Sequence, residues 1–186
     1  MRGLFVEDAD EFAVWIATSL RGLACWRLGP ATRLAGIGSL SPLHISNQVY
    51  AVLLAGRPSA SPRLTVTTPV PEMVAALNGF QPEALIAYPS VAAALAEEQL
   101  QGRLRIGPTV VGTSSSEVQT ADMRRRMVVA WQVQPLDFYG TTEALVPAAG
   151  RQGQAGMDIL EDLVVLEVVD ERNRPVPPGV PGTRCC

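Results

Sequence analysis

Residues 84–112 read ALIAYPSVAAALAEEQLQGRLRIGPTVVG, and this stretch decides the fold class. The apolar run at 84–87 predicts a strand, the helical pattern at 90–100 predicts a helix, and the apolar run at 109–112 predicts a second strand. A strand, a helix and a strand of these lengths are typical of the right-handed crossover unit of a parallel sheet.

The same alternation continues on both sides of this unit. Short apolar runs are each followed by a helical pattern, in the pairs 35–39 with 42–54, 64–67 with 71–78, and 109–112 with 120–131, and a last run lies at 136–139. An amphipathic helix over 8–20 and a connection over 21–33 precede them. The sequence therefore predicts an α/β fold whose mainly parallel sheet has helices on both faces.

The last third of the chain has a different pattern. Residues 163–169 are apolar and β-branched, which predicts a long strand, and residues 170–182 are rich in Pro, Gly and charged residues, which is typical of a turn. The strand expected after this turn falls beyond the sequence. We therefore expect one unit over residues 1–144 and the start of a smaller β unit over residues 145–186.

Composition excludes several classes of partner. The net charge of −3 offers no general attraction for nucleic acid. The run Arg124, Arg125, Arg126 points in three directions on a predicted helix, which favours a solvated surface over a phosphate clamp. No apolar run approaches the roughly 20 residues that span a bilayer, and the N-terminus is acidic, so we predict a cytoplasmic protein with no membrane partner.

Residues 137–144, DFYGTTEA, stand at the end of a predicted strand, where a parallel sheet places its ligand crevice. Their side chains suit a nucleotide, because an aromatic ring can stack on a purine, hydroxyls can donate to phosphate oxygens and a carboxylate can hold Mg²⁺. An ordinary strand-to-loop turn would explain the same residues, since Gly and Thr are common there. The chemistry alone leaves both interpretations open.

Four ordered segments carry a resemblance to a known family. The segment Tyr139–Glu143 resembles the Tyr-Gly-x-Thr-Glu motif of adenylate-forming enzymes. Three further segments are similar to the phenylacetate–CoA ligase branch of these enzymes, namely 77–82 with 88–90, 113–117, and 161–170 with 175–179. The resemblance covers most of the chain and implies an acid–CoA ligase, in which a carboxylic acid, expected to be aromatic, is adenylated with ATP and then joined to CoA.

The resemblance also implies roles for individual residues. Tyr139 would stack on adenine, with Gly140 and Thr141 beside it, Thr142 would contact the α-phosphate, and Glu143 would help to hold Mg²⁺. The loop that carries Ser115, Ser116 and Glu117 would flank the adenine and the acyl pocket, although hydroxyls that approach a helix N-terminus would look the same. His44 and Tyr88 are candidates for the substrate pocket, and a structural role for the single histidine stays open.

Other parts of the family pattern do not occur in the sequence. They are the Ser/Thr/Gly-rich phosphate loop, the ribose-binding Asp, and the C-terminal domain with its catalytic Lys; every one of the 15 basic residues is Arg. We therefore expect an internal, incomplete piece of the N-terminal domain of such a ligase, without full activity on its own. The alternative is a non-catalytic nucleotide-binding or interaction module derived from such an enzyme. The resemblance leaves a homodimer open.

Two other enzyme classes fit less well. The pair Gly36 and Gly38 lacks the third glycine and the later acidic residue of a dinucleotide-binding fingerprint. A serine hydrolase would need a Gly-x-Ser-x-Gly elbow, and the sequence has none.

Overall fold

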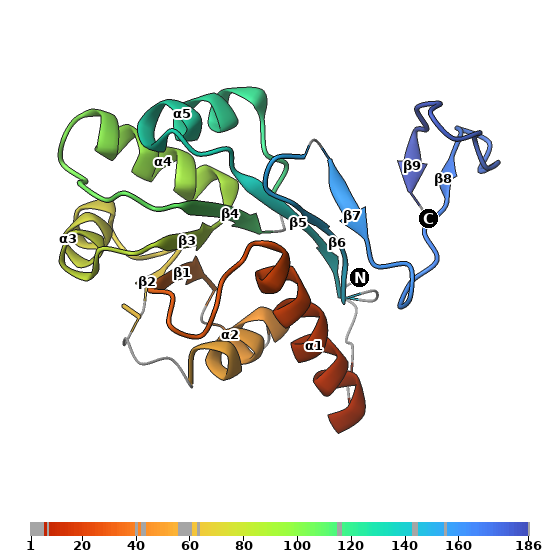
Figure 1. Ribbon diagram of the computed structural model, residues 1–186, viewed down its shortest axis with the longest axis horizontal. Helices are drawn as coiled ribbons and strands as arrows, with labels where there is room; N and C mark the ends of the chain where they lie inside the picture. The colour runs from red at the N-terminus through yellow and green to blue at the C-terminus, as the bar shows by residue number, and fades with distance from the viewer. Residues whose placement is uncertain are drawn as a thin grey trace.

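The computed structural model describes residues 6, 8–39, 41, 44–55, 61–62, 64–114, 117–142, 145–154 and 156–185. Its main feature is a seven-stranded sheet in the order β2-β1-β3-β4-β5-β6-β7 (Figure 1). The strands are β1 (Leu34–Gly38), β2 (Leu64–Thr65), β3 (Ala84–Ala87), β4 (Val110–Ser114), β5 (Leu136–Thr141), β6 (Leu145–Gly150) and β7 (Met157–Ile159). The helices are α1 (Ala9–Cys25), α2 (Ile45–Ala55), α3 (Val70–Phe80), α4 (Pro89–Leu100) and α5 (Ala121–Trp131).

The sheet is parallel from β2 to β5 and antiparallel at β6 and β7. The chain moves outward from β1 to β2 and then returns to β3 on the other side of β1, so its direction reverses between β1 and β3. Helices α1 and α2 cover one face, and α3, α4 and α5 cover the other (Figure 1). The predicted α/β class, a mainly parallel sheet with helices on both faces, is confirmed.

Alternating side chains give each face its own core, because successive residues of a strand point to opposite sides. On β3, Leu85 and Ala87 join the core under α3 to α5, whereas Ala84 and Ile86 join the core under α1 and α2. All four of these residues are at most 2% exposed. Full burial on both faces explains why the central strands read as unbroken apolar runs.

Helix α1 is longer than the sequence indicated. Asp8 caps its N-terminus with a capping box to Glu11, as the acidic first turn favours. The helix continues through Gly22 to Cys25, so the first part of the predicted connection 21–33 is helical. A side chain at Gly22 would collide with the ring of Phe138, so this glycine allows the helix to pack closely on β5. Tertiary packing thus outweighs the low helix propensity of glycine.

Strands β6 and β7 were not predicted. Their sequence contains Pro147 and several small residues, which are poor strand signals. They form because β5 offers an unpaired edge, on which Tyr139 lies opposite Ala148. Both strands fall within residues 145–186, yet they extend the main sheet; the division into two units at residue 144 stays a prediction.

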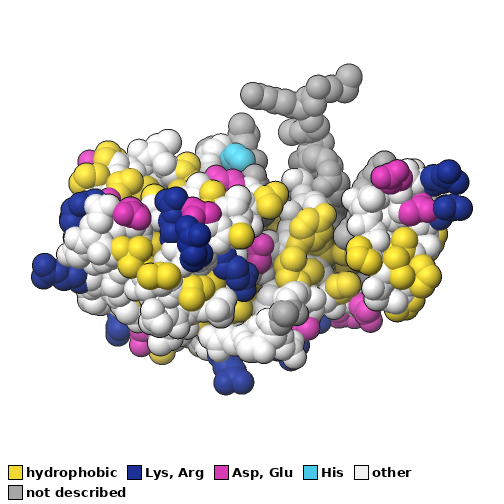
Figure 2. All heavy atoms as spheres, turned by 90° about the horizontal axis from the view of Figure 1, so that it is seen from above, with side chains coloured by type: hydrophobic (Ala, Val, Ile, Leu, Met, Phe, Trp, Pro, Cys, Tyr) yellow, Lys and Arg dark blue, Asp and Glu magenta, His cyan; other side chains and the backbone are white. Residues whose placement is uncertain are grey.

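The predicted long strand over 163–169 is wrong, since only its last two residues, β8 (Val168–Val169), are in a strand. This strand pairs with β9 (Arg184–Cys185) in a separate two-stranded sheet, so the expectation that the next strand falls beyond the sequence is wrong. Leu163 is 44% exposed and Val165 is 87% exposed. Figure 2 shows hydrophobic side chains at the surface of the part at the right, where β8 and β9 lie in Figure 1. An apolar run without a neighbouring strand to bond it does not become a strand.

Two surface predictions can be compared with the fold. Arg125 and Arg126 both pair with Asp122 on the exposed side of α5, which confirms the solvated helix surface. Basic and acidic side chains lie next to one another on the helical side in Figure 2. In the described part of the chain, no helix combines the length and the apolar character needed to cross a membrane.

Candidate functional site

The loops that follow parallel strands meet at one edge of the sheet, here called the carboxyl edge. Strands β3, β4 and β5 are neighbours in register, with Ala87 opposite Thr113 and Ser114 opposite Phe138. The segments after these strands therefore begin side by side. The ends of these strands and the residues directly after them include Tyr88, Thr113, Glu117 and the segment 139–142, all from segments that the sequence nominated.

The strand end of β5 presents its motif to solvent. Tyr139 is 42% exposed, Thr142 is exposed, and Gly140 and Thr141 are half-buried. The register between β5 and β6 shifts between Tyr139 and Thr141, so the regular pairing of the two strands is interrupted within the motif. Glu143 lies outside the described residues, so its role as the magnesium ligand stays a prediction.

A rigid aromatic layer lies beneath this motif. The rings of Phe138 and Trp26 stack with centroids 4.0 Å apart, and Trp26 is fully buried. The indole N–H of Trp26 donates to the backbone oxygen of Gly150 at 2.8 Å, which ties the end of α1 to β6. Leu136 and Phe138 face α1, so Asp137 and Tyr139 face the opposite side, toward α5.

A chain of polar contacts joins β5 to β4 and α5. The hydroxyl of Thr113, which is fully buried, lies 3.1 Å from both the backbone oxygen of Leu136 and Oδ1 of Asp137. It accepts a hydrogen bond from Nε2 of Gln119 at 2.8 Å, and Oε1 of Gln119 accepts from Arg124 at 3.1 Å. Burial raises the pKa of the Asp137 carboxyl, and the hydrogen bond from Thr113 opposes this shift.

Glu117 has a structural partner at this edge. Its carboxylate accepts from the backbone N–H of Ser90 at 2.9 Å and from the Ser90 hydroxyl at 2.8 Å. These bonds satisfy one of the free N–H groups at the start of α4 and place a negative charge at the positive end of that helix. Glu117 therefore acts as a cap in this structure, and its predicted nucleotide contact stays a prediction. Ser115 and Ser116 lie outside the described residues.

The two pocket candidates follow β1 and β3 in the chain, the two strands between which the strand order reverses. Tyr88 follows β3 and is half-buried. Burial raises the pKa of the Tyr50 hydroxyl, and the nearby Tyr88 phenol adds to that shift, so α2 brings a second tyrosine to the same place. A Cβ on Gly36 would come within 2.8 Å of the Tyr50 ring. His44 is exposed immediately before α2, and its predicted role as a pocket residue stays a prediction.

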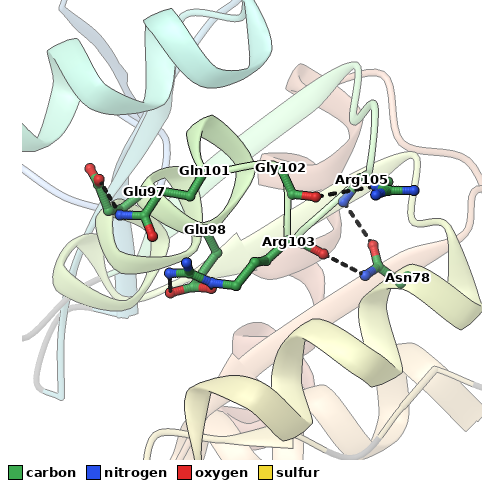
Figure 3. Close-up of polar contacts among 7 residues, drawn as sticks. All are labelled: Asn78, Glu97, Glu98, Gln101, Gly102, Arg103 and Arg105. Atoms are coloured by element: carbon green, nitrogen blue, oxygen red, sulfur yellow. Dashed lines mark hydrogen bonds and ion pairs between the residues drawn. The ribbon is translucent and has the colours of Figure 1, made fainter.

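The segment 77–82, which contributed to the family resemblance, lies at the opposite edge of the sheet, here called the amino edge. The Asn78 side chain donates to the backbone oxygen of Arg103 at 2.9 Å and accepts from the N–H of Arg105 at 2.7 Å (Figure 3). The Gln99 side chain likewise donates to the backbone oxygen of Ile106 at 3.0 Å and accepts from the Ile106 N–H at 3.1 Å. These two amides bind one extended segment as a neighbouring strand would, so this motif is structural here.

A groove at the amino edge was not foreseen from the sequence. Its volume is about 400 Å³, and its lining residues are Trp26, Arg27, Leu28, Ala31, Thr32, Glu83, Thr109, Val110 and Gln152. These residues precede β1, β3 and β4, begin β4 or follow β6, so the groove lies at the opposite edge of the sheet from the β5 motif. Its position gives no support to the nucleotide assignment, which depends on the carboxyl edge.

The fold is similar to part of several solved CoA ligases. The chain matches a solved 2-hydroxyisobutyryl-CoA ligase in complex with 2-HIB-AMP and CoA, with a TM-score of 0.79, 20% identity, and coverage of 95% of this chain and 39% of that one. It matches an anthranilate CoA ligase in complex with anthranoyl-AMP at a TM-score of 0.67, with 17% identity over 89% of this chain and 33% of that one.

An ATP-bound RpMatB-BxBclM chimera matches at a TM-score of 0.62 and 19% identity, over 89% of this chain and 33% of that chain. The chain thus spans between a third and two fifths of the length of these three proteins. Comparison of the sequence with protein-family models gave no match, and comparison with curated protein sequences gave none either. At these identities the likeness establishes the fold.

Three polar residues at the carboxyl edge were not predicted to contact the motif segments. They are Ser90, Gln119 and Arg124. Their signal in the sequence is weak, because each is a polar residue in or beside a helix start, where solvated side chains are common. Gln119 reaches back to Thr113 on the strand before it, and the parallel pairing of β4 with β5 places the Thr113 hydroxyl beside Asp137.

Proposed function

We propose that this chain is part of an ATP-dependent acid–CoA ligase of the phenylacetate–CoA ligase type, with the nucleotide at the carboxyl edge of β4 and β5. The observation that carries the proposal is that Tyr139 and Thr142 are exposed at the end of β5, where the register with β6 shifts, in a sheet whose fold is similar to that of solved CoA ligases. Solved proteins of the same fold contain acyl-AMP, ATP or CoA.

The proposed reaction has two steps. The acid carboxylate attacks the α-phosphorus of ATP and releases pyrophosphate, and the CoA thiol then displaces AMP from the acyl-adenylate. Tyr139 would hold the adenine ring by stacking, and the Thr142 hydroxyl would donate to the α-phosphate. Such a site acts mainly by orienting the reactants and by stabilising phosphate charge.

Magnesium would neutralise charge on the nucleotide phosphates, and carboxylate oxygen is the ligand that it prefers. Within the described residues, no group of three or more His, Cys, Asp or Glu side chains could hold a metal ion by itself. A single carboxylate together with the nucleotide's own phosphate oxygens fits this donor set, and we assign that carboxylate to Glu143. The sequence contains no Lys, so any amine in the reaction would have to come from outside these 186 residues.

The test is acid-dependent ATP–pyrophosphate exchange by the protein expressed from its complete reading frame. Aromatic acids such as phenylacetate and benzoate would be compared with 2-hydroxyisobutyrate, and Glu143→Gln with the wild type. We expect exchange that needs an acid, prefers an aromatic one, and falls by about 100-fold or more in Glu143→Gln. ATP binding without exchange for any acid would support the non-catalytic nucleotide-binding module instead, and no ATP binding at all would contradict both.

A further inference from the structure

The contacts around Thr113 extend beyond what a pair of neighbouring strands requires. Backbone bonds already join β4 to β5, with Thr113 opposite Asp137. The Thr113 hydroxyl adds a link to two acceptors on β5, at 3.1 Å each, and receives Gln119 at 2.8 Å. One fully buried oxygen therefore connects the strand of the motif, the strand before it and the segment that leads into α5.

Gln119 can make these contacts in one orientation only. Its Nε2 donates to Thr113 while its Oε1 accepts from Nη1 of Arg124. Rotation of the amide by half a turn would place its nitrogen against the Arg124 cation, and the Thr113 hydroxyl could then bond the amide oxygen only by giving up its donation to β5. In the run 124–126, the second and third arginines pair with Asp122, whereas Arg124 turns to Gln119.

The ionised carboxyl of Asp137 is energetically unfavourable at its position. Its carboxyl is half-buried, and burial raises its pKa, so an uncharged side chain of the same shape would be easier to accommodate. Asp137 is also two residues before Tyr139 and on the same side of β5. Perturbed groups next to a candidate ligand site are typical of functional positions.

We infer that Thr113 and Gln119 are positioning residues that hold the segment after β4 at a fixed spacing from Tyr139 on β5, and that this spacing sets the affinity for the nucleotide. The inference rests on the proposed function. Neither residue needs to touch the nucleotide. The hydroxyl of Thr113 acts through Asp137 and the β5 backbone, and Gln119 acts through Thr113.

The test uses Thr113→Val, Thr113→Ser and Gln119→Leu in the protein expressed from its complete reading frame. Valine keeps the volume of threonine and removes the hydroxyl, whereas serine keeps the hydroxyl. Thr109→Val is the control, because Thr109 directly precedes the same strand and its hydroxyl donates to the backbone oxygen of Glu83 at the amino edge, at 3.2 Å. ATP·Mg²⁺ affinity is measured by titration, and amide hydrogen exchange is followed in residues 110–114, 117–122 and 136–142.

We expect Thr113→Val and Gln119→Leu to weaken ATP·Mg²⁺ binding by about fivefold or more and to speed exchange in all three segments. Thr113→Ser should restore most of the affinity, and Thr109→Val should change neither quantity at the carboxyl edge. Unchanged affinity in Thr113→Val would overturn the inference, even with faster exchange, because the hydroxyl would then be merely structural. If the wild type does not bind ATP·Mg²⁺, the proposed function fails. Unchanged hydrogen exchange in Thr113→Val would separately show that the hydroxyl does not couple the three segments.

Discussion

The two edges of the sheet use polar side chains in different ways. At the amino edge, Asn78 and Gln99 each make two hydrogen bonds to the backbone of the segment 103–106, which joins α4 to β4. At the carboxyl edge, Tyr139 and Thr142 are exposed, and Asp137 is held half-buried with a raised pKa. Side chains at the first edge complete the fold, whereas those at the second are placed where a ligand can reach them.

Two segments that both contributed to the family resemblance differ in this respect. Segments 77–82 and 139–143 both contribute to the family resemblance, yet Asn78 of the first binds a loop, whereas Tyr139 and Thr142 of the second are exposed at the end of a strand. Resemblance alone therefore does not show which motif binds a ligand.

The largest effect that we predict is at the amino edge. The double variant Asn78→Ala, Gln99→Ala should lose about 2–4 kcal/mol of unfolding free energy, because the backbone groups of residues 103–106 lose four hydrogen bonds. Urea unfolding measures this loss, and ATP affinity should stay unchanged. Gln101→Ala is the control, since that exposed side chain bonds only Glu97 in the described contacts and should cost little. A double variant as stable as the control would show that the hydrogen bonds of Asn78 and Gln99 to residues 103–106 do not stabilise the fold.

A smaller effect should follow the loss of the α4 cap. Glu117→Ala should lower the unfolding free energy by about 1 kcal/mol, because the Ser90 N–H and the start of α4 lose their carboxylate. Glu117→Gln, which keeps an acceptor oxygen, should lose less. Thermal unfolding and ATP titration of both variants separate the two roles, since an affinity loss without a stability loss would place Glu117 at the nucleotide rather than at the helix.

The smallest effect concerns pH. The pKa of Asp137 is raised in the folded protein, so its stabilising contribution is full below the ordinary value of about 3.9 and is lost as pH rises through the folded pKa. Asp137→Asn does not ionise and escapes that loss. The stability of the variant relative to wild type should therefore increase between about pH 4 and pH 7. Urea unfolding at several pH values checks this, and a variant that loses relative stability over that range would contradict the burial argument.

Sequence patterns located most of the parallel sheet but not its antiparallel end. The run 84–87 is a strand with the predicted bounds, because a strand buried on both faces leaves a continuous apolar signal. Strand β6, with Pro147 and Gly150, has no such signal and depends on the free edge of β5. The apolar run 163–169 shows the reverse case, since its composition suits a strand but only Val168 and Val169 find a partner.

The candidate site was predictable only in part for a related reason. Tyr139 and Thr142 stand out because their residue types suit a nucleotide and follow a predicted strand. The links from Thr113 to Asp137, 24 residues away, and from Glu117 to Ser90, 27 residues away, depend on which strands become neighbours. The spacing of these residues along the chain does not predict the two contacts.

The central claim is that the carboxyl edge binds the nucleotide and the amino edge does not. Its most direct test compares ATP·Mg²⁺ affinity and stability in Tyr139→Ala and in Asn78→Ala, in the protein expressed from its complete reading frame. We predict that Tyr139→Ala weakens binding by about tenfold at nearly unchanged stability, since loss of aromatic stacking is worth about 1–3 kcal/mol. Asn78→Ala should lose stability at unchanged affinity. Wild-type affinity in Tyr139→Ala, together with weakened binding in Asn78→Ala, would contradict the account.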